Sequence, residues 1–276
     1  MKFGYSPNII RTFTPLPEPR LWFQNIDSQS ITYFGSTNWT ESYWKGLIYP
    51  LKTKSSDFLY HYSRFFDSIE LNTTFYRIPS SEQVIKWKNS TPEGFIFCPK
   101  IPASISRSKL LGLNSQIWHD FAESMSFFED QLGPCFMQLP EYFDTSRICQ
   151  LQELMESNQI ISPLMIELRH QSWFINTSTI NELCIQLSQK QSGLVITDTA
   201  GRQDVIHMNI TCPYLFIRFV SNGIPEYDEL RLMNWCSTLE KLKDKGLKQI
   251  HFIFHHPNPH QMIACVKNMK KHHNVN

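Results

Sequence analysis

From residue 31 onward the chain alternates short apolar runs with longer amphipathic segments, and this alternation constrains the fold more than any other feature. The apolar runs are rich in β-branched and aromatic side chains, which is typical of strands. The segments between them repeat apolar residues every three to four positions, which indicates helices. The expected strands are 31–35, 68–71, 95–98, 135–139, 164–167, 194–197, 215–218 and 250–254. The expected helices are 57–66, 80–89, 115–131, 146–158, 177–189, 227–245 and 260–270.

Alternating strands and helices imply parallel strand pairing with helical crossovers, and hence an α/β protein. The eight strands predict a single-domain, closed (β/α)8 TIM-like barrel over residues 31–276. Only the crossover at 199–214 is weakly helical. An open doubly wound sheet is the alternative. It would normally carry a glycine-rich phosphate turn after its first strand, and GSTNW at 35–39 is no such turn.

Residues 1–30 differ in composition from the rest of the chain. Pro7, Pro15, Pro17 and Pro19 fall in this segment, and proline blocks regular helix and central strand. Aromatic residues stand between these prolines, which favours contact with a surface. We therefore predict an extended, proline-rich N-terminal arm that crosses the main domain.

Bulk composition narrows the class of protein. With 41% hydrophobic and 18% charged residues the chain can form a large core, and a net charge of +1 gives no global basic field for nucleic acid. The seven cysteines are widely spaced without a C-x-x-C pair, so we expect no disulfide framework and no structural zinc site. The first twenty residues lack the apolar run of a secretory leader, and no run approaches the ~20 residues of a membrane span. These features predict a soluble, cytoplasmic protein without a membrane partner.

Polar and ionisable residues follow the apolar body of each predicted strand. In a closed barrel the ligand site lies at the carboxyl ends of the strands, so these side chains are expected to meet in one pocket. The candidate catalytic residues are Glu70, Glu167 and Asp198. The candidate substrate-binding residues are Trp39, Asn72, Tyr76, Lys100, Gln138, Arg169, Arg218 and His255.

Charge suggests the roles. Lys100, Arg169 and Arg218 suit a small anionic ligand, since guanidinium and ammonium groups bind phosphate and carboxylate. The three carboxylates suit general acid–base catalysis. The competing interpretation is a structural ring in which the cations neutralise the acids. Glu167 and Arg169 lie two positions apart and would share a face of a strand, which favours a simple intrastrand salt bridge. His170 would face the opposite side and is interpreted as structural.

Metal and aromatic ligand contacts are weaker candidates. His255 and His256 with Glu167 and Asp198 would suit a divalent metal, but adjacent strand residues face opposite sides. We therefore predict no metal site and no cofactor, with a divalent metal as a minor alternative. Trp39 and Tyr76 are candidates for stacking on a base or a sugar.

Three stretches resemble the YecE-like family, also called domain of unknown function 72. They are FFDSIELNTTFYRIPSSEQVIKWKNSTPEGFIFCPKIPASISR at 65–107, GPCFMQLPEYF at 133–143 and MIELRHQSWF at 165–174. The motifs occur in the family's order, and the resemblance spans about 31–269. It implies a TIM-like barrel but no established reaction. The family's pocket positions correspond here to Glu70, Asn72, Tyr76, Lys100, Gln138, Glu167, Arg169, His170, Trp173, Asp198 and Arg218.

The chain departs from the family pattern in two places. Phe219-Val220 follow Arg218 where the family usually has a His-Gly pair, and His255-His256 replace an Asn pair. Together these observations predict an enzyme, a hydrolase, lyase or isomerase, acting on a small phosphorylated or sugar-like anion. A single-stranded nucleic-acid-binding or endonuclease-IV-like phosphodiester-processing barrel and a non-catalytic structural or regulatory barrel are the alternatives. The sequence leaves the oligomeric state open.

Overall fold

Eight parallel strands form the main sheet of the computed structural model, which describes residues 13–24, 30–157, 163–175, 177–199 and 201–273. The order across the sheet is β4-β3-β2-β10-β9-β7-β6-β5, and every pairing is parallel. The strands are β2 (Ile31–Ser36), β3 (Ser68–Leu71), β4 (Ile96–Pro99), β5 (Cys135–Gln138), β6 (Leu164–Glu167), β7 (Gly193–Thr199), β9 (Tyr214–Val220) and β10 (Gln249–His255).

The two ends of this sheet, β4 and β5, come together and nearly close it into a barrel. Isolated parallel bridges join Lys100 to Phe136 and Phe97 to Leu132. The backbone N–H of Ile101 donates to the carbonyl of Phe136 over 2.8 Å. An open doubly wound sheet would leave these two edge strands apart, so the barrel-like prediction describes the sheet better.

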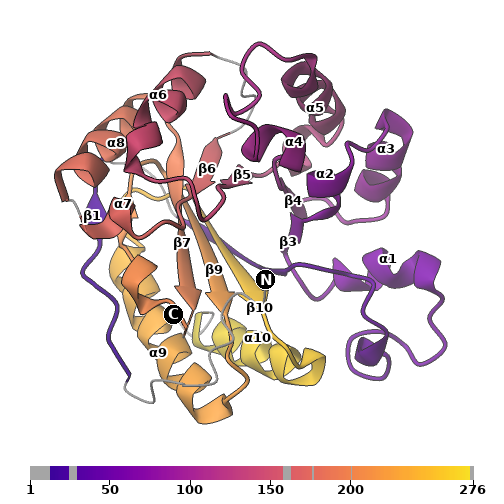
Figure 1. The fold of residues 1–276 in the computed structure, drawn as a ribbon. Coiled ribbons are helices and arrows are strands. Elements are labelled where there is room, and N and C mark those ends of the chain that lie inside the picture. Colours follow the sequence, from indigo (N-terminus) through magenta and orange to yellow (C-terminus); the bar gives the residue numbers. More distant parts are fainter. Residues whose placement is uncertain (1–12, 25–29, 158–162, 176, 200, 274–276) are drawn as a thin grey trace.

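Helices surround the sheet on its outer side (Figure 1). The longer ones are α3 (Ser81–Asn89), α5 (Gln116–Ser126), α6 (Ile148–Glu156), α8 (Thr177–Gln189), α9 (Pro225–Leu242) and α10 (Pro259–His273). The shorter ones are α1 (Phe58–Tyr62), α2 (Thr73–Tyr76), α4 (Ala103–Ser106) and α7 (Ser172–Ile175), with 3-10 turns η1 (Ser42–Trp44), η2 (Ser55–Asp57), η3 (Glu129–Gln131), η4 (Thr145–Arg147) and η5 (Gln203–Val205). No helix within the described ranges has both the length and the apolar character needed to cross a bilayer.

Most predicted elements overlap observed ones, although the helix expected at 57–66 ends at Tyr62. Two further predictions differ for identifiable reasons. The helix expected at 115–131 ends at Ser126, and the chain continues through Glu129, whose φ of 51° lies outside the right-handed α-helical region. Asp57 precedes α1, but its carboxylate caps no helical N–H and accepts instead from the Ser56 hydroxyl. The crossover after β7 holds one 3-10 turn, η5, and a short strand, β8 (Asn209–Ile210), in agreement with its weak helical pattern.

Two apolar layers pack against the sheet, one on each face. The outer layer is the large core between strands and helices. The inner layer fills the interior of the sheet and consists of Ile96, Cys98, Phe136, Met165, Val195, Cys212, Phe216 and Ile253. The strands are therefore buried on both faces, which explains why they are almost continuously apolar in sequence.

Part of the predicted N-terminal arm, residues 13–24, lies among the described residues. Arg20–Leu21 form a short parallel strand, β1, with Asn209–Ile210. The backbone N–H of Leu16 donates to Asn234 on α9, and the Ser188 hydroxyl on α8 donates to the carbonyl of Trp22. This part of the segment therefore runs along the outer helices. The remaining positions of the predicted arm, 1–12 and 25–29, lie outside the described residues.

Candidate functional site

A polar layer lies on the interior face of the sheet, just beyond the inner apolar layer and toward the carboxyl ends of the strands. Side chains along a strand alternate between faces, so a residue two positions after an interior residue also faces the interior. Six polar residues at the carboxyl ends of strands stand two positions after a member of the inner apolar layer: Lys100, Gln138, Glu167, Thr197, Arg218 and His255. The structure therefore brings five of the predicted site residues, all of this set except Thr197, to one face of the sheet.

Arg218 lies at the centre of this layer and connects two buried carboxylates. Its Nε and Nη2 donate to the two oxygens of Glu70 over 2.9 and 3.1 Å, and its Nη1 donates to Oε2 of Glu167 over 2.7 Å. Asn72 donates to Oε1 of Glu70 over 3.0 Å, and His255 Nε2 lies 3.0 Å from Oε2 of Glu70. Both oxygens of Glu70 thus accept two bonds each, so Glu70 anchors Arg218 and has little capacity left to exchange protons.

A second chain of hydrogen bonds runs from Glu167 to Lys100. Gln138 Nε2 donates to Oε2 of Glu167 over 2.9 Å, and Lys100 Nζ donates to Oε1 of Gln138 over 3.0 Å. The Lys100 amine also lies 4.6 Å from the centre of the Phe75 ring and 5.5 Å from that of Phe136. Lys100 forms no ion pair with a carboxylate among the described residues. An amide and two aromatic rings stabilise its charge instead.

Burial and mutual charge set the protonation states. Burial alone would raise the pKa of Glu70, but Arg218 and His255 outweigh it and hold that pKa well below its usual range. Burial and then the Arg218 charge lower the pKa of Lys100 to about 8, against the opposing effect of Glu70 and Glu167. Burial likewise lowers the pKa of His255, so the imidazole is neutral near pH 7 and donates its Nε2–H to Glu70.

Three buried oxygens of the polar layer have no hydrogen-bond partner among the described residues: Oε1 of Glu167 and the hydroxyls of Thr197 and Thr199. Thr197 is the register partner of Arg218, whose side chain reaches past β7 to Glu167 on β6. A buried carboxylate oxygen without a donor is costly, so it normally has a water or ligand partner. Glu167 is therefore the carboxylate of this layer that retains an available acceptor.

Arg169 does not pair with Glu167 as the two-residue spacing predicted. β6 ends at Glu167, and beyond it the chain turns, so the alternation of a strand no longer applies. Arg169 Nη2 instead donates to Glu141 over 3.0 Å, and Glu167 pairs with Arg218. His170 makes local contacts with Ser172, which agrees with its structural interpretation.

The structure separates Asp198 from the polar layer. On β7, Thr197 and Thr199 share the interior face with Val195, so Asp198 faces outward, toward α9. Its carboxylate accepts from Arg231 over 2.7 Å and from the indole N–H of Trp235 over 2.9 Å. The prediction that Asp198 joins the pocket is therefore wrong, and the residue links β7 to α9.

Four further aromatic and imidazole residues that the sequence singled out contact other parts of the structure. Tyr76 is 84% exposed, whereas Trp39 is half-buried and packs edge-on against Trp87. Trp173 is fully buried and donates its indole N–H to the carbonyl of Phe143, so it belongs to the core. His256 accepts a hydrogen bond from the backbone N–H of Asn258, whereas its neighbour His255 binds Glu70. Among the described residues no group of three or more His, Cys, Asp or Glu side chains is arranged to hold a metal.

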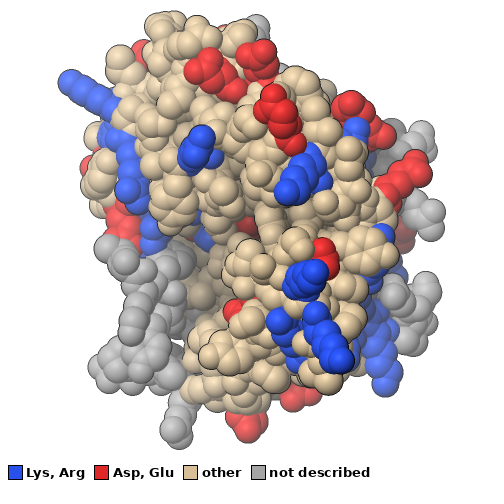
Figure 2. Space-filling model, turned by 90° about the vertical axis from the view of Figure 1, so that its right-hand side faces the viewer, with Lys and Arg blue, Asp and Glu red and all other residues tan. Residues whose placement is uncertain are grey.

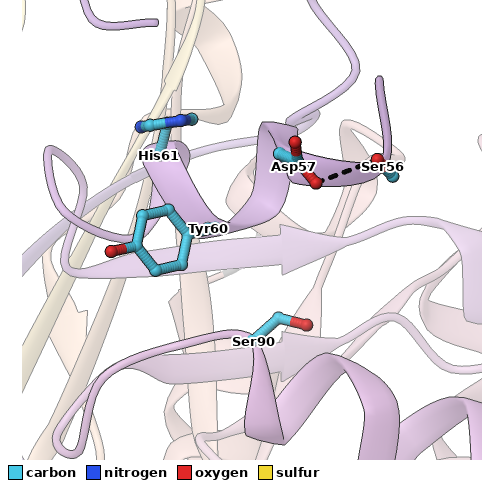
Figure 3. Close-up of a pocket in the computed structure, with 5 residues that line it drawn as sticks. All are labelled: Ser56, Asp57, Tyr60, His61 and Ser90. Carbon is cyan, nitrogen blue, oxygen red and sulfur yellow. Dashed lines mark hydrogen bonds between the residues drawn. The ribbon is translucent and has the colours of Figure 1, made fainter. Parts of the chain in front are cut away.

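A separate cavity of about 380 Å³ lies on the outer side of the sheet (Figure 3). Ser56, Asp57, Tyr60, His61 and Ser90 line it, and they come from η2, α1 and the end of α3. None of the predicted site residues is among them.

The chain belongs to the family described as "Protein of unknown function DUF72", which matches residues 33–275. Its relatives include the UPF0759 protein YecE of Escherichia coli K12, 29% identical over 167 residues, which are 60% of this chain and 59% of the relative. The UPF0759 protein YunF of Bacillus subtilis 168 is 29% identical over 150 residues, 51% of this chain and 52% of the relative. These alignments span only a little over half of each relative.

Solved structures of the same family share the fold. A DUF72 family protein from Enterococcus faecalis V583 superimposes with a TM-score of 0.70 at 19% identity, over 90% of this chain and 99% of the other. One from Thermotoga maritima MSB8 gives a TM-score of 0.69 at 23% identity, over 87% and 99% of the two chains. At these identities the likeness concerns the fold alone, a mixed α/β protein with a barrel-like parallel sheet.

Proposed function

We propose that this protein is an enzyme that acts on a small phosphorylated or sugar-like anion at the carboxyl ends of the strands. The proposal rests on two buried polar groups whose hydrogen-bonding capacity or charge is only partly matched. One buried oxygen of Glu167 has no hydrogen-bond partner among the described residues. The buried amine of Lys100 donates to Gln138 and forms no ion pair with a carboxylate in the described part of the chain. Gln138 on β5 binds both side chains and links them across the interior face, from the end of β4 to the end of β6.

Each residue of the polar layer then has a distinct role. Lys100 and Arg169 attract the anion; the pair that Arg169 forms with Glu141 is partly exposed, so an incoming anion can exchange with it. Glu167 serves as the general base through its available oxygen. Arg218 takes a positioning role, because its charge is already matched by Glu70 and Glu167 and is no longer available to a ligand.

Binding of inorganic phosphate, measured by isothermal titration calorimetry, tests this assignment. The variant Lys100→Met removes the charge at the site, and Lys190→Met removes the charge of a partly exposed lysine that pairs with Glu156. A charge-assisted hydrogen bond contributes about 1.5–3 kcal/mol, so Lys100→Met should weaken binding by roughly ten-fold or more. Equal binding by both variants, or none by the unmodified protein, counts against the proposal.

The non-catalytic alternative predicts charges that are all mutually paired. Arg218, Glu70 and Arg169 fit that pattern, but Lys100 and the Oε1 of Glu167 do not, and this difference favours an enzyme. The nucleic-acid alternative requires exposed aromatic platforms and a continuous basic surface. Tyr76 is exposed, yet on the face in Figure 2 basic and acidic side chains are interspersed. Binding of a single-stranded oligonucleotide that weakens steeply with added salt would support the nucleic-acid alternative.

A further inference from the structure

The amine of Lys100 is enclosed at the end of β4, where the two ends of the sheet meet. Lys100 is 8% exposed and forms the bridge to Phe136 that joins β4 to β5. The rings of Phe75 and Phe136 lie 4.6 and 5.5 Å from its Nζ, and Gln138 accepts from it. An amine held this way is desolvated, and within the described part of the chain one neutral acceptor, Gln138, orients it.

This environment raises the fraction of the amine that is in the neutral, nucleophilic form. Burial and the neighbouring Arg218 lower the pKa of Lys100 to about 8. A lysine with that pKa is neutral in roughly a quarter of molecules at pH 7.5, compared with about one in a thousand for a lysine of ordinary pKa. Desolvation beside another cation is the usual way in which a lysine becomes a nucleophile toward carbonyl compounds.

We propose that Lys100 forms an imine with the carbonyl group of a small anionic substrate. This inference rests on the proposed function and narrows it, because imine formation suits a lyase or an isomerase of carbonyl compounds better than a hydrolase. Arg169 holds the anionic end of the substrate, while the carbonyl carbon lies at Nζ of Lys100. Glu167, joined to Lys100 through Gln138, provides the carboxylate that takes and returns protons.

The steps balance without an oxidant or reductant. The lone pair of the neutral Nζ forms a bond to the carbonyl carbon, and the carbonyl oxygen takes a proton to give a carbinolamine. The nitrogen gives a proton to Glu167, which passes it to the oxygen, while the oxygen's other proton comes from solvent. The carbon–oxygen bond then breaks to release water as the nitrogen lone pair forms the C=N bond. The products are a protonated imine on Lys100 and one water, and the imine draws electrons from a carbon–hydrogen or carbon–carbon bond next to it.

Reductive trapping tests this proposal directly. The protein is incubated with dihydroxyacetone phosphate and sodium borohydride, and the adducts are mapped by mass spectrometry of peptides. We expect labelling of Lys100 at least about ten times that of Lys190, a partly exposed lysine of ordinary environment. The variant Lys100→Arg keeps the charge and should give no adduct at this position. Circular dichroism of that variant, compared with the unmodified protein, checks that the fold is retained.

Two further arms separate this inference from the proposed function. Dihydroxyacetone without its phosphate should label Lys100 about ten-fold less, because it lacks the anion that Arg169 holds. Equal labelling by both compounds would support the imine and contradict anion binding. Binding of inorganic phosphate without preferential labelling of Lys100 would overturn the imine and leave the proposed function in place.

Discussion

Arg218 and Glu70 form a bidentate ion pair across the interior of the sheet, although strands β2 and β10 separate the strands that carry them. The contact is possible because the sheet curls until β4 meets β5. Both side chains are almost completely buried, and Arg218 also binds Glu167. This pairing therefore fixes the relative positions of three strands at the carboxyl end of the sheet.

Removing the central cation should destabilise the fold strongly. In Arg218→Met the carboxylates of Glu70 and Glu167 lose their shared partner while they stay buried, and breaking such a network costs about 3–5 kcal/mol. The free energy of unfolding, measured by urea denaturation, should fall by that amount. The control Lys190→Met removes a partly exposed pair and should change it by less than about 1 kcal/mol. A similar small change in both variants would contradict the assigned role.

Substitution of Asp198 should affect stability and leave the ligand site intact. In Asp198→Asn the buried Arg231 loses one of its two carboxylate partners, the other being Asp228, so we expect a loss of about 2–4 kcal/mol. Phosphate binding should match that of the unmodified protein under conditions where both are folded. Weakened phosphate binding by a folded Asp198→Asn variant would show instead that Asp198 contributes to the ligand site.

The buried imidazole of His251 predicts a loss of stability in acid. Its ring stacks between Tyr33 and Phe216, its Nε2 donates to Gln249, and burial lowers its pKa to about 3. Because the unfolded state takes up a proton near pH 6.5 and the folded state does not, stability is complete above that pH. It falls as the pH drops from about 6.5 toward 3, by about 2 kcal/mol at pH 5 from this residue.

Denaturation at pH 7 and pH 5 measures this contribution. The variant His251→Gln has no imidazole to titrate, so its stability should fall less between the two pH values than that of the unmodified protein. The variant His119→Gln changes an exposed side chain and should keep the full decrease. His207, whose pKa burial lowers to about 4, contributes a separate decrease that both variants retain.

The sequence predicted which residues meet more reliably than how they pair. Glu70, Lys100, Gln138, Glu167 and Arg218 converge as expected, because parallel strands bring their carboxyl ends to one edge. Pairing depends on distances between strands that are far apart in sequence, and no local spacing encodes them. The expected bond between Glu167 and Arg169 is therefore replaced by longer-range ones.

The position of Asp198 could not be deduced from the sequence for a different reason. The strands are apolar on both faces, so alternation alone does not reveal which face is interior. Val195 and Ile196 are equally apolar, yet Val195 belongs to the inner layer and Ile196 to the outer core. Arg231, the partner of Asp198 on α9, would have been the useful signal, since a charged residue on the buried face of a helix requires a partner.

The titration of Lys100 tests the central claim most directly, since both the binding role and the enclosed environment of its amine depend on it. NMR of protein labelled with ¹³C-lysine, with the resonance assigned through Lys100→Arg, gives the pKa of this one group. We predict a pKa of about 8 that rises when inorganic phosphate binds, because a bound anion favours the charged amine. A pKa near the ordinary lysine value of about 10.4, unchanged by phosphate, would contradict the account.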